Sequence, residues 1–174
     1  NSKMKKVLAI CLMMVMVVSM SATAFAAPNG FVSSPSGNAA PTVVGFDPSD
    51  DDCTANLVIT PYGDKHELPD ALRTLFEKAY NDIVNTKNLT TLNEALAKLA
   101  ASKNIDGTKL AVSDLFDIHV TGCAYHEGHA DFDVTLDADT LSHFVALLHM
   151  NQKGEWELVT DAEVVNNGEH LKFS

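Results

Sequence analysis

The stretch Leu68–Val84, LPDALRTLFEKAYNDIV, carries the clearest structural signal in this chain of 174 residues. Its apolar side chains recur every three or four positions, which is the spacing that places them on one face of a helix. Pro69 suits the first turn of a helix, because the N–H that proline lacks has no partner there. We therefore predict an amphipathic helix whose apolar face covers a core.

A second helix is predicted from Thr91, because its spacing to Glu94 matches a capping box. The apolar positions that follow fall on one helical face: Leu92, Ala95, Leu96, Leu99 and Ala100. The link Asn85–Thr90 is short enough to join the two helices as a helical hairpin.

Most of the remaining apolar residues alternate with polar ones in a period of two, which is typical of strands. The expected strands are Leu57–Ile59, Val112–Val120, Phe132–Leu136, Phe144–Met150, Trp156–Leu158, Glu163–Val165 and His170–Phe173. Turn sequences at Asn151–Gly154 and Asn166–Gly168 predict two β-hairpins. We expect an α+β domain over residues 53–174, in which the helical hairpin packs on an antiparallel β-sheet or a small β-sandwich.

The N-terminal segment has the features of a secretory signal peptide. Two lysines precede the apolar run Val7–Met20, and Ala24–Ala26 has the small residues of a cleavage site. We predict that residues 1–26, which include three residues before Met4, form a signal peptide cut after Ala26. An uncut membrane anchor and lipidation of Cys11 are the alternatives, but the run is short for a span and Ile10 is not the small residue that should precede a lipidated cysteine.

An extended linker or arm is expected over residues 27–52, where Pro, Gly, Ser, Asn and Asp dominate without a regular period. Within it, Phe31–Val32 and Thr42–Val44 could each add a short edge strand. Asp50–Asp52 could ligate calcium, but a solvated turn is favoured because the glycine and the glutamate of an EF-hand loop are missing. At the other end, the alternating run Leu171–Ser174 has no turn after it, and we expect the domain to continue beyond it.

The charge of the chain is strongly acidic. Its formal net charge is −11, and removal of Lys3, Lys5 and Lys6 with the leader would leave 9 basic against 23 acidic residues, or about −14. Such a balance repels nucleic acid and anionic lipid. We expect a secreted or cell-surface protein with no nucleic-acid partner and no membrane insertion of the mature domain.

Two cysteines follow residue 26, Cys53 and Cys123. In an exported domain an even pair is typical of one disulfide. It would close a loop of about 70 residues and stabilise the fold by about 3–4 kcal/mol in the chain-entropy estimate. Two separate buried thiols are the alternative.

A zinc site is the alternative interpretation of the segment around Cys123. This thiol, His126 and His129 have suitable ligand types for Zn²⁺, with His119 as a fourth ligand. Their spacing matches no standard zinc pattern. The favoured interpretation is a polar hairpin loop between the two flanking strands, with Cys123 bonded to Cys53 and no cofactor.

No catalytic or cofactor-binding residues emerge from the sequence. Ser113 and Ser142 lie outside any nucleophile elbow. Carboxylate pairs such as Asp131 with Asp133, or Asp137 with Asp139, alternate along a strand and its exit, which favours a solvated face over an acid–base pair. The aromatic residues Tyr62, Tyr80, Tyr125 and Trp156 could stack on sugars, but their spacing favours packing in the core. An enzyme is the less favoured class.

Four segments resemble a family of uncharacterised secreted or cell-surface proteins of clostridia and related Gram-positive bacteria: Phe31–Ser36, Cys53–Tyr62, Val112–Asp117 and Trp156–Val165. The resemblance implies one more strand after Ser174 and, in some members, a wall or membrane anchor. It brings no catalytic residues. The leading hypothesis is a noncatalytic extracytoplasmic interaction or structural module whose partner is an extracellular protein or glycan; a zinc-binding or zinc-dependent protein is the alternative.

Overall fold

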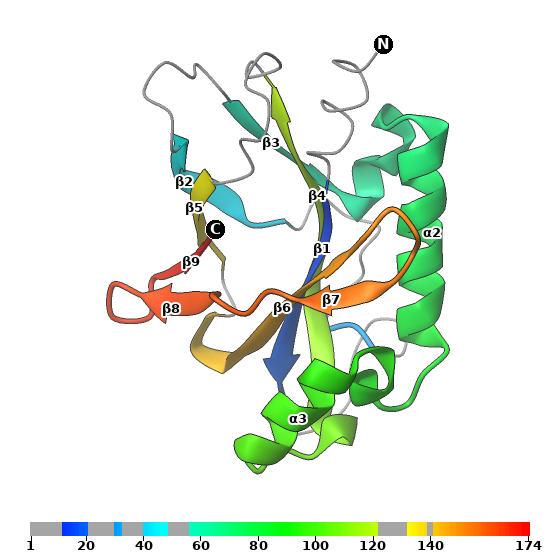
Figure 1. The fold of residues 1–174 in the computed structure, drawn as a ribbon, viewed down its shortest axis with the longest axis vertical. Helices are drawn as coiled ribbons and strands as arrows, with labels where there is room; N and C mark the ends of the chain where they lie inside the picture. Colours follow the sequence, from blue (N-terminus) through cyan, green and yellow to red (C-terminus); the bar gives the residue numbers. More distant parts are fainter. Residues whose placement is uncertain (1–11, 21–29, 33–39, 49–55, 122–131, 139–140) are drawn as a thin grey trace.

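Two antiparallel sheets and a layer of helices make up the fold in the computed structural model, as the α+β expectation requires (Figure 1). The structure describes residues 12–20, 30–32, 40–48, 56–121, 132–138 and 141–174. The first sheet has five strands in the order β3 (Asn56–Pro61), β4 (Leu110–Thr121), β1 (Leu12–Ser19), β6 (Phe144–Met150) and β7 (Trp156–Leu158). The second has four in the order β2 (Thr42–Pro48), β5 (Phe132–Asp137), β9 (His170–Phe173) and β8 (Glu163–Val165).

The two predicted helices are confirmed as α2 (Asp70–Val84) and α3 (Glu94–Ser102). The Thr91 capping box is wrong, because Asn93 is the N-cap of α3 and its side-chain oxygen accepts a hydrogen bond from Leu96 N at 2.9 Å. In the described part of the chain, four 3₁₀ segments accompany the helices: η1 (Tyr62–Glu67), η2 (Leu89–Leu92), η3 (Gly107–Lys109) and η4 (Leu141–His143). Among the described residues, no helix has both the length and the apolar character needed to cross a membrane.

Two hydrophobic clusters lie on opposite faces of the five-stranded sheet. The helix-side cluster joins that sheet to α2 and α3 through residues such as Phe76, Ile83 and Leu96. The inter-sheet cluster joins it to the second sheet through residues such as Phe116 and Leu171. The described residues therefore form three layers, with the five-stranded sheet in the middle.

The central strand of this sheet, β1, comes from the segment that the sequence predicts as a signal peptide. It pairs antiparallel with β4 on one side and β6 on the other. Met13 through Val18 are each at most 2% exposed. A continuous run of Met and Val is typical of the apolar part of a leader, and it is equally typical of a strand that is buried on both faces. Cleavage after Ala26, where the sequence predicts it, would remove β1 from the sheet.

The predicted hairpin between the strands that flank residues 122–131 is wrong. Those strands are β4 and β5, and they belong to different sheets: β4 pairs with β3 and β1, and β5 pairs with β2 and β9. Alternation fixes which face of a strand is buried but leaves its partner open. The chain therefore crosses from one sheet to the other at this point.

The other two predicted hairpins are confirmed. β6 pairs with β7 across Asn151–Glu155, and β8 pairs with β9 across Asn166–Glu169. Asn166 and Asn167 have φ angles of 56° and 57°, a left-handed conformation that asparagine tolerates better than most residues.

Parts of the predicted arm contact the domain. Phe31 is 1% exposed and forms a parallel bridge with Val112 of β4. Thr42–Val44 belongs to β2, which is an edge strand as expected.

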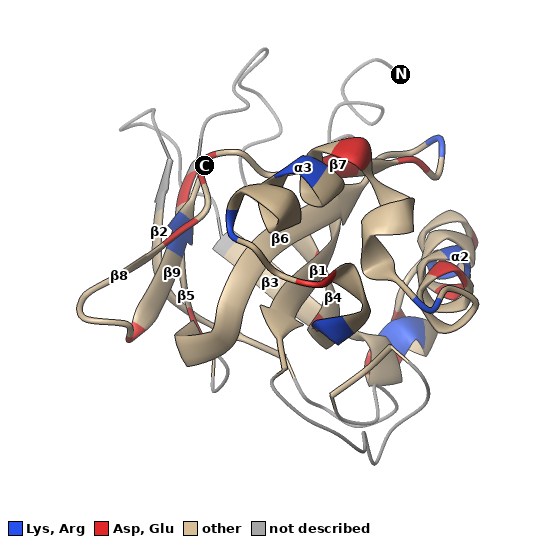
Figure 2. Ribbon diagram, turned by 90° about the horizontal axis from the view of Figure 1, so that it is seen from below, with Lys and Arg blue, Asp and Glu red and all other residues tan. Residues whose placement is uncertain are grey.

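Charged residues lie on the helices, on the connecting segments and on strands of the second sheet such as β8 and β9 (Figure 2). The central strands β1 and β6 contain no Asp, Glu, Lys or Arg. This distribution fits the burial of both strands in the middle layer.

Candidate functional site

Of the four candidate zinc ligands, His119 alone falls within the described residues. It lies near the end of β4, with a side chain that is 26% exposed. Cys123, His126 and His129 lie outside those residues, as do both cysteines of the predicted disulfide. Within the described part of the chain, no group of three or more His, Cys, Asp or Glu side chains is placed to hold a metal ion.

His119 forms a pair with Asp117, two residues earlier on the same face of β4. His119 Nδ1 lies 3.1 Å from Asp117 Oδ2. The Asp117 side chain is fully buried, and its Oδ1 has no hydrogen-bond partner among the described residues. Burial raises the pKa of this carboxyl, while the hydrogen bond and the charge of His119 act in the opposite direction.

The surroundings of Asp117 explain its burial. On either side of it in the sheet stand Thr60 of β3 and Met13 of β1. Cross-strand partners project to the same face, so the carboxyl is enclosed by a methionine and a threonine on the helix side. Loss of Met13 would open one side of this enclosure.

The pair has the arrangement that orients a histidine. A carboxylate at Nδ1 fixes the ring and leaves Nε2 as the nitrogen that could bind a metal or transfer a proton. The sequence brings these two residues together in a simple way, because positions i and i+2 of a strand share one face. The zinc interpretation named His119 as a ligand and gave Asp117 no role, so the positioning role of this carboxylate was missed.

A second histidine, His149 on β6, faces the opposite side of the sheet. It lines a hollow of about 230 Å³ together with Met14, Asp161 and Ser174, among others. His149 Nε2 lies 3.7 Å from Glu157 Oε2, while its buried Nδ1 has no hydrogen-bond partner among the described residues. Burial lowers the pKa of His149, and the charge of Glu157 opposes this.

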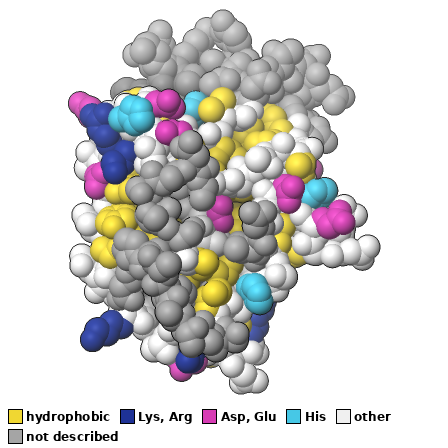
Figure 3. Space-filling view, turned by 180° about the vertical axis from the view of Figure 1, so that it is seen from behind, with side chains coloured by type: hydrophobic (Ala, Val, Ile, Leu, Met, Phe, Trp, Pro, Cys, Tyr) yellow, Lys and Arg dark blue, Asp and Glu magenta, His cyan; other side chains and the backbone are white. Residues whose placement is uncertain are grey.

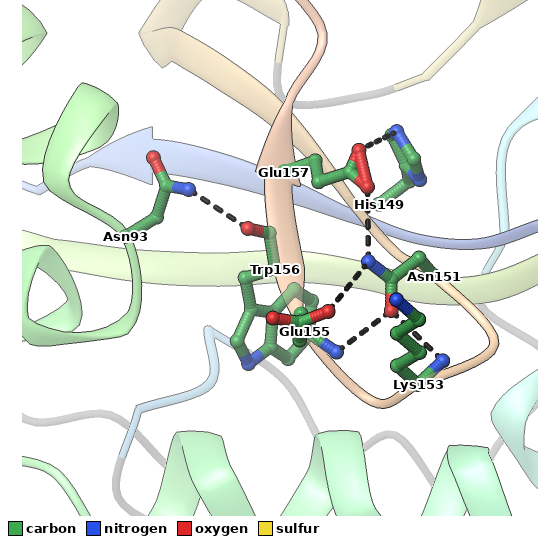
Figure 4. A network of polar contacts seen from close by, with 7 residues as sticks. All are labelled: Asn93, His149, Asn151, Lys153, Glu155, Trp156 and Glu157. Atoms are coloured by element: carbon green, nitrogen blue, oxygen red, sulfur yellow. Dashed lines mark hydrogen bonds and ion pairs between the residues drawn. The ribbon is translucent and has the colours of Figure 1, made fainter.

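The β6–β7 turn holds Glu157 beside His149 (Figure 4). Asn151 Oδ1 accepts hydrogen bonds from the backbone N–H groups of Lys153 at 2.9 Å and Glu155 at 3.0 Å. Asn151 Nδ2 donates to Glu157 Oε1 at 3.0 Å and to Glu155 Oε1 at 3.3 Å. The sequence reasoning missed this pair, although a lone histidine in an apolar strand and the turn sequence after it are visible signals.

The hollow beside His149 does not contain an activated nucleophile. Ser174 donates hydrogen bonds from its backbone N–H and its hydroxyl to Asp161 Oδ2. A nucleophilic serine needs a base such as histidine as its immediate partner, with the carboxylate behind that base. Here the hydroxyl donates to the carboxylate itself, and the contact joins the residue after β9 to the link between β7 and β8.

A larger hollow of about 550 Å³ lies next to it, between α3, β6 and the β7–β8 link. Its lining is mostly apolar and includes Leu99, Phe144, Val145, Leu158 and Val164. The two hollows share Leu158, Val159 and Thr160. The two linings mix apolar side chains with polar ones, among them Lys103 and Glu163 in the larger hollow and His149 and Asp161 in the smaller one.

Among the described residues, the carboxylates of the candidate acid–base pairs lie on a solvated face and the tyrosines pack in the core, as the sequence favoured. Asp133 and Asp137 are exposed, as expected for a solvated face. Tyr62 stacks on Tyr80 with centroids 5.1 Å apart, and Tyr80 also stacks on Phe31 at 5.5 Å. These ring faces are used within the core and are not available to a sugar. Tyr125 lies outside the described residues.

Exposed large apolar side chains concentrate on two edge strands. Within the described residues they are Val43 and Val44 of β2 and Val58 of β3, with exposed fractions of 36%, 49% and 40%. β2 and β3 are edges of different sheets and contact each other. Viewed from behind, hydrophobic side chains reach the surface among acidic and basic ones (Figure 3).

Comparisons with protein-family models, with curated proteins and with solved structures found no match to this chain.

Proposed function

We propose that this chain is a noncatalytic extracytoplasmic interaction or structural module at the bacterial cell surface, with an extracellular protein or glycan as its partner. The observation that carries the proposal is the surface formed by the adjacent edge strands β2 and β3, called here the edge surface, with Val43, Val44 and Val58 exposed. Edge strands present unpaired backbone groups, and exposed apolar side chains on them favour pairing with another chain.

The edge surface has features that limit uncontrolled association. The pairing of β2 with β5 shifts between Val43 and Gly45, so the edge is irregular around Val44. Such an irregularity interrupts a continuous edge and favours a selected partner over nonspecific sheet growth. The acidic charge of the chain supports solubility outside the cell.

The first experiment asks where the protein resides. The full chain is expressed with its own N-terminus in a Gram-positive host, and the medium, wall and cytosolic fractions are analysed by mass spectrometry. We expect a product in the medium or wall fraction that begins at Ala27. A cytosolic product that retains residues 1–26 would contradict the proposed location.

The second experiment asks whether the edge surface binds. The exported protein is titrated onto intact cells that lack it, beside a Val44→Lys, Val58→Lys double variant. Lysines on an edge disfavour strand pairing, and we expect binding to fall roughly tenfold or more. An Ala71→Lys, Thr74→Lys double variant, at two exposed positions of α2, adds the same two charges away from this surface and is the matched control. Equal binding by all three proteins would count against the edge surface.

A zinc-binding function is the second candidate, and the Asp117–His119 pair favours it. The ladder of β3 and β4 ends at Asn56 and Thr121, so the sequence places Cys53 and Cys123 within three residues of the same end. A disulfide there would remove the thiolate that zinc needs. Mass spectrometry of the exported protein separates the cases: a mass two hydrogens lower without metal supports the disulfide. A stoichiometric zinc adduct with free thiols, lost on His126→Ala or His129→Ala, supports the zinc site.

A further inference from the structure

The space occupied by β1, called here the central slot, is shaped for a single extended strand. On one side Leu12–Ser19 pairs with β4, from Leu12 opposite Ile118 to Ser19 opposite Leu110. On the other side it pairs with β6, from Met13 opposite Met150 to Val18 opposite Phe144. Both pairings are antiparallel, so β4 and β6 both present backbone groups to the slot.

The slot takes apolar side chains on both faces. Met13, Val15 and Val17 enter the helix-side cluster, and Met14 and Met16 enter the inter-sheet cluster. Each of these side chains is between 0% and 2% exposed. A strand that fills the slot must therefore be apolar at successive positions, unlike a strand that covers a sheet with one wet face.

The two walls of the slot are connected through the helix layer as well as through β1. On the β6–β7 side, Trp156 Nε1 donates to Asp82 Oδ2 of α2 at 3.0 Å, and Asn93 Nδ2 of the α3 cap donates to Trp156 O at 2.9 Å. On the β3–β4 side, Tyr62 directly follows β3 and packs edge-on against Phe76 of α2, with centroids 5.5 Å apart. α2 therefore holds both walls, and departure of β1 leaves two strand edges facing a common gap.

We propose that, once the leader has been removed, the central slot binds an extended apolar segment of a partner protein, about eight residues long, which pairs antiparallel with both β4 and β6. The inference rests on the proposed function, because it requires cleavage after Ala26. It identifies the partner as a peptide segment with consecutive large apolar residues, recognised by two rows of backbone hydrogen bonds and by pockets on both faces.

A partner chain is the better source of this segment than a second copy. After residue 26, the comparable uncharged run with large apolar side chains is Phe144–Met150. That run is β6, which already forms one wall of the slot. A second copy could donate it only by dismantling its own sheet.

The test uses the full chain exported by a Gram-positive host and identified by mass as beginning at Ala27. The probe is a synthetic peptide with the sequence of Leu12–Ser19 and lysines at both ends for solubility. We expect one-to-one binding by fluorescence anisotropy, together with slower amide hydrogen exchange in β4 and β6. If the exported protein is unfolded alone, folding on addition of the peptide is equally expected, because the peptide supplies the missing strand.

Matched peptides separate strand insertion from nonspecific adsorption. Val15→Asp places a carboxylate at a position with 0% exposure, and we expect roughly hundredfold weaker binding. Ser19→Asp adds the same charge at the less buried end of the strand and should bind nearly as the parent peptide does. Equal binding of both peptides would overturn the proposal.

The outcomes also distinguish this inference from the proposed function. An exported protein that begins at Ala27 but neither binds the peptide nor folds with it overturns the inference and leaves the surface module standing. A strand-swapped dimer that excludes the peptide overturns the choice of a partner chain. Retention of residues 12–19 in an exported protein overturns the inference alone, since β1 then fills the slot permanently, whereas a cytosolic product overturns the proposed location.

Discussion

Trp156 on β7 donates its indole N–H to the carboxylate of Asp82 on α2 at 3.0 Å, and Lys78 Nζ lies 2.7 Å from the same carboxylate oxygen. The indole is 9% exposed, and its ring belongs to the helix-side cluster. One carboxylate thus connects the last strand of the five-stranded sheet to the longest helix. The contact joins residues far apart in the sequence and fixes the helix layer on the sheet.

We expect Trp156→Phe to lower the free energy of unfolding by about 1–2 kcal/mol, because it removes a charge-assisted hydrogen bond and part of a buried ring. Urea denaturation measures the change. Lys98→Ala, which removes an exposed pair with Glu94 at 3.5 Å, should cost only a few tenths of a kcal/mol. Similar losses in the two variants would show that the indole contact is not special.

The cap of α3 provides a second stability prediction. Asn93 accepts from Leu96 N and donates to Trp156 O, so Asn93→Ala removes both contacts. We expect a loss of about 1–2 kcal/mol by thermal unfolding. Thr91→Ala, at the cap position that the sequence suggested, is the control and should cost less. A larger loss of stability in Thr91→Ala than in Asn93→Ala would support the capping box at Thr91 instead.

The buried carboxyl of Asp117 should make stability decrease as the pH rises. Burial raises its folded-state pKa above the ordinary value of 3.8. The stability that it contributes is therefore fully present below that ordinary value and is lost as the pH rises through the folded pKa. We expect Asp117→Asn to stabilise the full chain at pH 7 more than at pH 4, as measured by urea denaturation. Asp133→Asn, at an exposed position, should show no such difference.

His149 should have the opposite pH dependence. Burial lowers its folded-state pKa below the ordinary value of 6.5, so the folded chain resists protonation of this ring. The stability that it contributes is present above that value and is lost as the pH falls through the folded pKa. We expect His149→Leu to flatten the loss of thermal stability on acidification below about pH 6.5. If thermal stability fell equally on acidification in both proteins, protonation of His149 would not be what destabilises the folded chain.

Local periodicity predicted the elements that depend on neighbours in the sequence. The helix at Leu68–Val84 and the two hairpins have their signals in consecutive residues, and the structure confirms them. The pairing of β4 with β1 has no local signal, because any strand with a suitable apolar face could lie beside β4. The same limit explains why β4 and β5 were expected to form a hairpin.

The candidate site was predictable to a similar extent. The Asp117–His119 pair follows from strand alternation alone, and the His149–Glu157 pair follows from the register of the β6–β7 hairpin. The burial that shifts the pKa of Asp117 depends on Met13, which belongs to a segment with the sequence of a leader. An apolar run of this kind is typical of a leader and also of a buried strand. The sequence alone therefore does not reveal that Met13 lies beside Asp117.

The position of β1 in the sheet has a consequence for the order of events during synthesis. Met13 pairs with Asp117 and with Met150, so both partner strands lie far downstream in the chain. Pairing between such distant segments is slow and waits until the downstream residues have been made. While the ribosome is still translating, Leu12–Ser19 has emerged without either partner, and this interval leaves the segment open to recognition by other machinery before the sheet can enclose it.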